Sequence, residues 1–292
     1  MFSASLALAL ASFLPQAPVE QAARPEGPAT TNDERFAAFD GVLNEAVEGG
    51  AVVGHNALIF QDGKVLYYGQ SGQRDRAKGL PMERDTIFRI YSMTKPITSL
   101  AAMQLVEAGK IKLDEPVATY LPGFADIKLL RKGKLVDPRR DMTVRDLMRH
   151  TSGLTYGFFG KSAVDKMYLE KGILVTDTSL EDMVSKLVEL PLQSKPRLRF
   201  HYSVSTDVLA RIIEVTSEEE FSAYLSKHIF EPLGMHDTFF TVPKDKLHRF
   251  AEMYKPVGEE LEPSPMRASR HFLRKTGLHS GGGGLCSTID DY

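Results

Sequence analysis

The chain has 292 residues, of which 42% are hydrophobic and 25% are charged, as in a globular protein rather than a disordered one. Its 36 Lys and Arg residues are matched by 38 Asp and Glu residues, and the sequence contains no basic stripe with interleaved aromatic residues, so we expect no nucleic-acid partner. The single cysteine, Cys286, cannot form an intramolecular disulfide, and we expect it to be a small buried residue.

Residues 1–22 are predicted to be a signal peptide or a disordered leader. The apolar run over residues 6–14 is followed by Pro15-Gln16-Ala17, which resembles the hydrophobic region and cleavage zone of a secretory signal. The charged start of such a signal is missing apart from the α-amino group, because no Lys or Arg precedes Arg24. This run is too short to cross a bilayer, so we expect a periplasmic or secreted protein without a transmembrane segment.

Residues 33–292 are predicted to form one domain of α+β class, with its strands early in the chain and mostly helices after them. Apolar residues at helical spacing predict a helix over 33–47 that ends near Gly49-Gly50. The β-prone runs 57–60 and 65–68 flank an Asp-Gly pair, which indicates an antiparallel hairpin. A third β-prone run covers residues 86–91. Further helices are predicted over residues 92–108, 143–150, 179–190, 206–215 and 218–229.

The segment Ser92-Met93-Thr94-Lys95 is the strongest candidate for catalysis, because a Ser and a Lys three residues apart share one helix face. A helix N-terminus offers free N–H groups and partial positive charge, both of which stabilise an oxyanion. A lysine acts as a base when burial or nearby positive charge lowers its pKa from about 10.4 toward 7. The spacing alone favours an N-cap serine and a surface lysine, so its context must decide.

The context is a set of five segments that resembles the serine β-lactamase and penicillin-binding superfamily, and within it the class C-like esterases. The resemblance extends from about residue 34 to the end of the chain. In chain order the segments are Tyr91-Ser92-Met93-Thr94-Lys95-Pro96-Ile97-Thr98-Ser99, His150-Thr151-Ser152-Gly153-Leu154, Tyr202-Ser203-Val204-Ser205-Thr206-Asp207, Pro232-Leu233-Gly234-Met235 and Ser280-Gly281-Gly282-Gly283-Gly284-Leu285.

This resemblance implies a β-lactamase/transpeptidase-like fold, in which helices flank an antiparallel sheet and a mostly helical subdomain stands beside it. It also implies three catalytic residues. Ser92 would be acylated, Lys95 would take or relay its proton, and Tyr202 would act as the second base and later protonate the leaving group.

The remaining polar candidates are predicted to be structural. His150 follows a short helix, where a contact with the helix dipole and a turn explain it, and Asp207 lies in the first turn of a helix, where a carboxylate complements the dipole. Residues 280–284 lack the pattern of a phosphate or dinucleotide loop and are expected to form a flexible turn near the cleft. We expect no metal and no cofactor, and the missing Gly-x-Ser-x-Gly elbow argues against an α/β-hydrolase.

Two departures from the family pattern affect the function that we expect. Val204 replaces the Asn that binds the acylamino group of penicillin-like substrates, which favours simple esters over amides. In the family, C-terminal strands that complete the sheet follow the glycine run, whereas this sequence ends at Tyr292, so we expect a truncated domain without those strands. Residues 287–291 predict only the start of a helix. The letters of Lys275-Thr276-Gly277 match the third family motif, but the flanking residues do not alternate as in a strand.

The favoured function is therefore a serine hydrolase that cleaves small carboxylic esters through an acyl-enzyme on Ser92, with acyl transfer to another alcohol as a variant. A β-lactamase or D-Ala carboxypeptidase would use the same nucleophile, and a non-catalytic remnant would use none. Without the C-terminal sheet strands we expect the chain to be weakly stable. Loss of one oxyanion donor typically costs about 100- to 1000-fold in rate, so we also expect weak activity. The sequence leaves the oligomeric state open.

Overall fold

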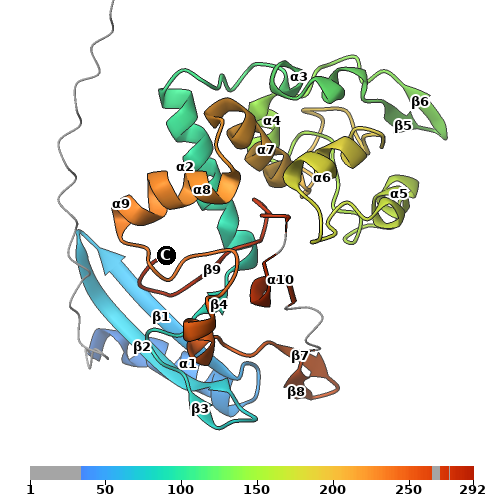
Figure 1. Ribbon diagram of the computed structural model, residues 1–292. Coiled ribbons are helices and arrows are strands. Elements are labelled where there is room, and N and C mark those ends of the chain that lie inside the picture. Colours follow the sequence, from blue (N-terminus) through green and yellow to red (C-terminus); the bar gives the residue numbers. More distant parts are fainter. Residues whose placement is uncertain (1–33, 265–269, 276) are drawn as a thin grey trace, which may run out of the picture.

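The computed structural model describes residues 34–264, 270–275 and 277–292 (Figure 1). The predicted leader, residues 1–22, lies outside the described residues, and so does Thr276 of the Lys-Thr-Gly tripeptide. The described chain forms a small antiparallel sheet with one helix along its face and a larger, mostly helical region beyond the sheet (Figure 1). The predicted α+β class is therefore confirmed.

The sheet consists of β1 (Gly54–Gln61), β2 (Lys64–Asp75) and β3 (Leu80–Pro81), in the order β1-β2-β3. Strands β1 and β2 form the predicted hairpin, with Gln61 paired to Lys64 across the turn. A 3-10 turn, η1 (Glu34–Phe36), leads into helix α1 (Ala37–Glu48).

Helix α1 packs against the sheet through aromatic contacts. The rings of Phe36 and Phe39 lie 5.1 and 5.2 Å from that of Tyr67 on β2, measured between centroids. The Tyr67 hydroxyl donates a 2.5 Å hydrogen bond to Asp40. The first predicted helix is therefore confirmed over its described part, and its apolar positions face the sheet as the spacing indicated.

A short two-stranded ladder connects the two ends of the molecule. Strand β4 (Phe88–Arg89) pairs with β9 (Cys286–Ser287), so only two residues of the β-prone run 86–91 form a ladder. The Ile90 N–H then donates to the Leu285 carbonyl at 3.0 Å. This pairing places the glycine run of residues 280–284 beside the segment that contains Ser92, although the two are far apart in sequence.

The helical region is built around α2 (Thr94–Glu107) and α7 (Ser205–Ser217), which pack against each other. Helix α7 also contacts α3, α4, α6 and α8, and eight of its residues are buried. Because α2 and α7 contribute apolar residues to the same core, the segments that begin each of them are held in a fixed relation. No helix in the described part of the chain is long and apolar enough to cross a membrane.

The predicted helices occur where expected. Helix α7 (Ser205–Ser217) is longer than the predicted 206–215, whereas three others are shorter, because turns and other helix types form their ends. They are α4 (Val144–Met148), α6 (Leu180–Leu187) and α8 (Phe221–Leu225), the last continuing through the π-helix η4 (Ser226–Phe230) into α9 (Glu231–Leu233). The elements that we did not predict are β3, α3 (Val117–Tyr120), η3 (Pro122–Asp126), β5 (Leu129–Arg131), β6 (Lys134–Val136), α5 (Ala163–Lys171), η5 (Lys244–Arg249), β7 (Tyr254–Val257), β8 (Glu260–Pro263), α10 (Arg270–Leu273) and β9.

The last residues of the chain are fixed by polar contacts. Asp290 forms an ion pair with Arg84, and the Asp291 carboxylate accepts hydrogen bonds from the Asp237 N–H and the Thr238 hydroxyl. The predicted helix start over residues 287–291 forms a single turn, in which the Tyr292 N–H donates to the Thr288 carbonyl.

Asp237 itself forms ion pairs with Arg249 and Lys246, at 2.7 and 2.8 Å. Burial raises the pKa of this carboxyl, but the two cations outweigh burial and lower the pKa from 3.8 to about 2. The ionised form is therefore more stable in the folded protein than in the unfolded chain. This contribution is present above pH 3.8 and is lost as the pH falls through about 2.

We predict that Asp237→Asn lowers the free energy of unfolding by about 2 kcal/mol at pH 7, and that the difference from wild type shrinks as the pH falls below about 4. Urea denaturation at a series of pH values measures both quantities. Asp177→Asn is the matched control, because Asp177 pairs with Arg274 at the surface, where ion pairs contribute little. Equal, pH-independent losses in the two variants would contradict the prediction.

Candidate active site

Ser92 lies in the 3-10 turn η2 (Tyr91–Met93), directly before helix α2. The residue before it, Tyr91, has a φ of 41°, a left-handed conformation that is uncommon for a bulky side chain. Such conformations persist where surrounding contacts impose them. Here those contacts include the Tyr91 ring against Phe272 and the Tyr91 hydroxyl, which donates to the Met253 sulfur.

The structure brings Ser92, Lys95 and Tyr202 together. The Ser92 Oγ accepts a 2.7 Å hydrogen bond from the Tyr202 hydroxyl and a 3.3 Å hydrogen bond from the Lys95 Nζ. Ser92 and Lys95 are adjacent because they are three residues apart at the start of α2, whereas Tyr202 arrives from the segment before α7. The predicted proximity is confirmed, and the catalytic roles of the three side chains stay predictions.

Lys95 is held in place by contacts on two sides. Its Nζ donates a 2.6 Å hydrogen bond to the carbonyl of Gly282, which is shorter than its contact with Ser92. The same nitrogen lies 4.5 Å from the ring centroid of Tyr202 and 5.5 Å from that of Tyr156. The rings and the carbonyl restrict the amine to a position next to the serine hydroxyl.

The glycine run is anchored to α7 by Asp207. This fully buried carboxylate accepts hydrogen bonds on one oxygen from the Ser280 hydroxyl, at 2.5 Å, and from the Gly282 N–H, at 3.0 Å. Burial raises the pKa of Asp207, and its second oxygen has no partner among the described residues. Any side chain at position 282 would collide with this carboxylate and with the Tyr156 hydroxyl, so the close approach requires glycine.

Our prediction for Asp207 and residues 280–284 is therefore corrected in part. Asp207 does lie in the first turn of α7, but its carboxyl bonds to the glycine run instead of acting only on the helix dipole. Residues 280–284 form a turn beside the cleft, as expected, but hydrogen bonds at Ser280 and Gly282 fix that turn in position. The sequence did not indicate the contact between Asp207 and Gly282, because the two residues are 75 positions apart.

His150, which we predicted to be structural, lies beside the site. Its ring centroid is 4.7 Å from that of Tyr202, and its Nδ1 accepts a hydrogen bond from the Ser203 N–H. Burial, together with Lys95 and His201, lowers the pKa of His150 to about 4. A neutral imidazole cannot act as the cation that a helix C-terminus attracts, so the predicted dipole contact is wrong. The ring instead supports the phenol of Tyr202.

Val204 does not face the cleft. Its side chain is fully buried in the hydrophobic core at the start of α7, so it offers neither an acceptor nor a donor to a ligand. Cys286 is also fully buried, as expected, and burial raises the pKa of its thiol to about 12. A thiol in this environment remains protonated and is not a nucleophile.

Ser92 opens into a cleft of about 340 Å³ whose walls are largely aromatic. Tyr156, Phe158, Phe159 and Tyr202 form one wall, and the glycine run forms part of the rest. A small number of polar groups in a largely apolar cleft is the usual composition of a ligand site. This cleft, with the hydroxyl of Ser92 at its edge, is the candidate active site.

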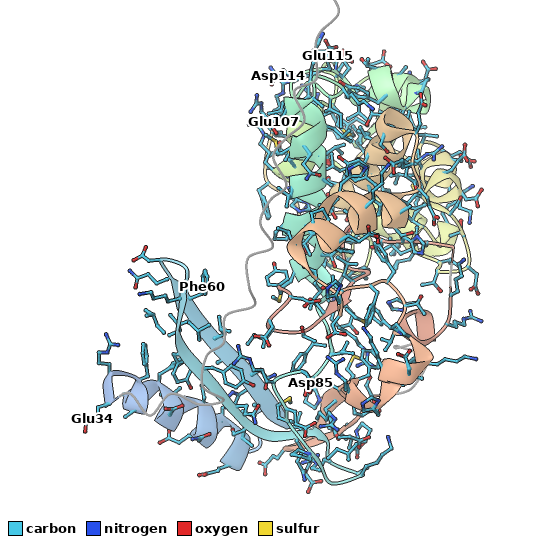
Figure 2. The ribbon with its side chains drawn as sticks, turned by 60° about the vertical axis from the view of Figure 1, so that its left-hand side comes forward. Glu34, Phe60, Asp85, Glu107, Asp114 and Glu115 are labelled. Carbon is cyan, nitrogen blue, oxygen red and sulfur yellow. The ribbon has the colours of Figure 1, made fainter. Side chains whose placement is uncertain are left out.

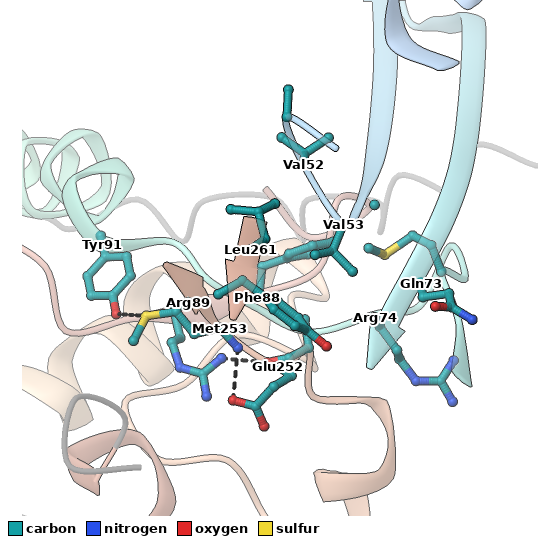
Figure 3. Close-up of a pocket in the computed structure, with 15 residues that line it drawn as sticks. Val52, Val53, Gln73, Arg74, Phe88, Arg89, Tyr91, Glu252, Met253 and Leu261 are labelled. Atoms are coloured by element: carbon teal, nitrogen blue, oxygen red, sulfur yellow. Dashed lines mark hydrogen bonds between the residues drawn. The ribbon is translucent and has the colours of Figure 1, made fainter. Parts of the chain in front are cut away.

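A second pocket of about 300 Å³ lies at the end of the sheet (Figure 3). Its walls include Val52, Phe88, Met253 and the guanidinium of Arg89, which donates to the Ala251 carbonyl. Tyr91 lines both pockets, but Ser92, Lys95 and Tyr202 line or approach only the first. The second pocket is therefore not lined by the three candidate catalytic residues.

Comparison with known proteins identifies a family and several relatives. The family described as Beta-lactamase matches residues 39–292. An uncharacterised protein of Mycobacterium tuberculosis is 32% identical over 255 residues, which are 86% of this chain and 63% of the relative. Esterase EstB of Burkholderia gladioli is 33% identical over 234 residues, or 79% of this chain and 56% of the relative. The chain thus spans less than two thirds of the length of these relatives.

Two solved structures have the same fold. EstCE1, described as a hydrolase with promiscuous acyltransferase activity, has a TM-score of 0.75 at 30% identity, over 86% of this chain and 68% of that one. An octameric penicillin-binding protein homologue from Pyrococcus abyssi has a TM-score of 0.66 at 29% identity, over 88% of this chain and 54% of that one. The predicted β-lactamase/transpeptidase-like fold and the resemblance to its esterase branch are confirmed.

We predict that Asp207→Ala slows the labelling of Ser92 by a fluorophosphonate about tenfold or more, because two donors of the glycine run lose their buried acceptor. Asp207→Asn should retain most of the rate, since a neutral amide keeps an acceptor oxygen and suits a site in which burial disfavours charge. Labelling rates by mass spectrometry and melting temperatures test this. Equal loss of labelling in both variants would contradict it.

Proposed function

The chain belongs to the beta-lactamase family, and from this membership we propose that it is a serine hydrolase that cleaves small carboxylic esters through a covalent acyl-enzyme on Ser92. The observation that carries the proposal is the hydroxyl of Ser92 within hydrogen-bonding distance of both a primary amine and a phenol. A serine hydroxyl is a weak nucleophile until an adjacent base removes its proton, and these two groups are the bases at hand.

In the acylation step, the Ser92 Oγ attacks the ester carbonyl while its proton passes to the amine of Lys95, either directly or through the Tyr202 oxygen. The new Oγ–C bond forms as the carbonyl π bond opens, which gives a tetrahedral oxyanion. The N–H of Ser92, at the positive end of α2, stabilises this charge. The Gly282 carbonyl keeps the Lys95 nitrogen in position for the transfer.

Collapse of the oxyanion breaks the bond to the alcohol part of the ester. Tyr202 donates its hydroxyl proton to the departing alkoxide, and Lys95 returns a proton to the phenolate. Water, activated by the same groups, then attacks the acyl-enzyme and releases the acid. A second alcohol in place of water would yield a new ester, which is the acyl-transfer variant of this mechanism and the activity named for EstCE1.

Two features of the structure and one relative support an ester over a β-lactam or a peptide. Val204 is buried and offers no polar group to an amide substrate. Among the described residues that line the cleft, none has an Asp, Glu, Lys or Arg side chain, so a substrate carboxylate such as that of a penicillin meets no cation on these walls. EstB, one of the relatives, is named as an esterase.

The nucleophile is tested by intact-mass analysis after exposure to a fluorophosphonate. We expect wild-type protein to gain the mass of one phosphonyl group and Ser92→Ala to gain none. Tyr202→Phe, which keeps the ring and removes only the hydroxyl, should label about 100-fold or more slowly, because general acid–base groups contribute about 10²- to 10⁴-fold. If Ser92→Ala labels as wild type does, or wild type does not label, the proposed acyl-enzyme is wrong.

The substrate class is tested by parallel assays of p-nitrophenyl acetate and a chromogenic cephalosporin. We expect kcat/KM for the ester to exceed that for the cephalosporin by at least about tenfold, since an unpaired carboxylate in an apolar cleft loses its hydration without compensation. A larger kcat/KM for the cephalosporin would favour the β-lactamase alternative with the same nucleophile.

A further inference from the structure

Phe158 and Phe159 are two cleft residues whose exposure to solvent is unusual for large apolar side chains. Their side chains are 55% and 68% exposed, although both are large and apolar. They are in contact with each other, at 4.4 Å between ring centroids, and both lie against Tyr156, at 5.1 and 5.8 Å. Together these three rings and Tyr202 form a continuous aromatic wall beside Ser92.

The loop that carries the two phenylalanines is held rigidly by Asp165. Its buried carboxylate accepts hydrogen bonds from the Thr155 hydroxyl at 2.6 Å and from the Ser162 N–H and hydroxyl at 2.9 and 2.7 Å, on the two sides of the loop. Gly160 packs so closely on this carboxylate that a Cβ atom there would collide with it. The exposed rings are therefore presented on a fixed backbone, as a preorganised binding surface requires.

The position of the wall identifies the part of the substrate that it contacts. In the proposed mechanism the Tyr202 hydroxyl gives its proton to the departing alkoxide, so the alcohol part of the ester lies beside Tyr202. Phe159 is 6.0 Å from Tyr202 between ring centroids, and Tyr156 is 5.4 Å away. A substituent on the alcohol would extend along these rings toward Phe158.

We propose that the Phe158-Phe159 pair selects esters whose alcohol part is a neutral, planar aromatic group. Planar rings stack on aromatic side chains in offset or edge-to-face arrangements and cover apolar surface that is exposed in the free protein. The absence of charged side chains among the described lining residues fits a neutral ligand. This inference rests on the proposed function, because the wall is assigned to the alcohol part of the ester from the proposed role of Tyr202.

The experiment compares kcat/KM for benzyl acetate and 2-methoxyethyl acetate, which share an acyl group and have similarly good leaving groups. Wild type should prefer the benzyl ester, and Phe159→Ala should reduce the ratio of the two kcat/KM values about three- to tenfold. Phe159→Tyr keeps a ring and should retain the preference. Phe60→Ala is the matched control, since Phe60 is 56% exposed on β1, away from the helical region (Figure 2).

A binding measurement separates this inference from the proposed function. Saturation-transfer NMR should detect benzyl alcohol bound to Ser92→Ala, and the signal should be lost when Phe159→Ala is added. If wild type hydrolyses neither ester, the proposed function fails, whereas the NMR result still decides whether the wall binds an aromatic alcohol. An unchanged kcat/KM ratio in Phe159→Ala, or benzyl alcohol binding that survives this substitution, overturns the inference.

Discussion

The position of the Lys95 amine between the Ser92 hydroxyl and the Gly282 carbonyl is the contact on which the rest of the site depends. An amine at the end of four methylene groups has many rotamers, and fixing it has a substantial entropic cost. The strong hydrogen bond to Gly282 and the two tyrosine rings offset that cost. As a result, the amine is held next to the serine hydroxyl before any substrate arrives, and such preorganisation is what the proposed proton transfer requires.

The Gly282 carbonyl can serve this purpose only because the glycine run is itself fixed. Asp207 accepts hydrogen bonds from two residues of the run, and the β4–β9 ladder holds the segment that follows it. Asp207 in turn belongs to α7, which packs on α2, the helix that carries Lys95. Lys95, Gly282 and Asp207 therefore constrain one another's positions through these contacts. The fully buried carboxyl of Asp207 is tolerated because it is hydrogen-bonded.

The opposite wall of the cleft is held together by contacts between aromatic rings. Tyr156, Phe158, Phe159 and Tyr202 contact one another through ring faces and edges, and among these four only Tyr202 donates a hydrogen bond to Ser92. The polar side of the cleft therefore positions the groups to which we assign proton transfer, while the aromatic side provides apolar surface. His150 belongs to this second side, because burial keeps its ring neutral and it packs against Tyr202.

The sequence by itself determined the features that depend on neighbours along the chain. The Asp62-Gly63 turn predicted the hairpin, and the spacing of Ser92 and Lys95 at a helix start predicted their contact, because such pairs are close in any helix. The capping box of Ser162 and Asp165 was also present in the sequence, yet we missed α5, since its apolar periodicity is weak. The two short hairpins β5–β6 and β7–β8 lacked the alternation that predicts strands.

Only the tertiary structure decided which distant residues complete the site. Gly282 is 187 positions from Lys95, and no local propensity specifies that contact. The same holds for the burial that makes His150 neutral and raises the pKa of Asp207, because the environment of a side chain is set by elements packed around it. The nucleophile could be proposed from the sequence because a single helical turn defines it, whereas its supporting groups exist only when the packing of α2 against α7 brings them together.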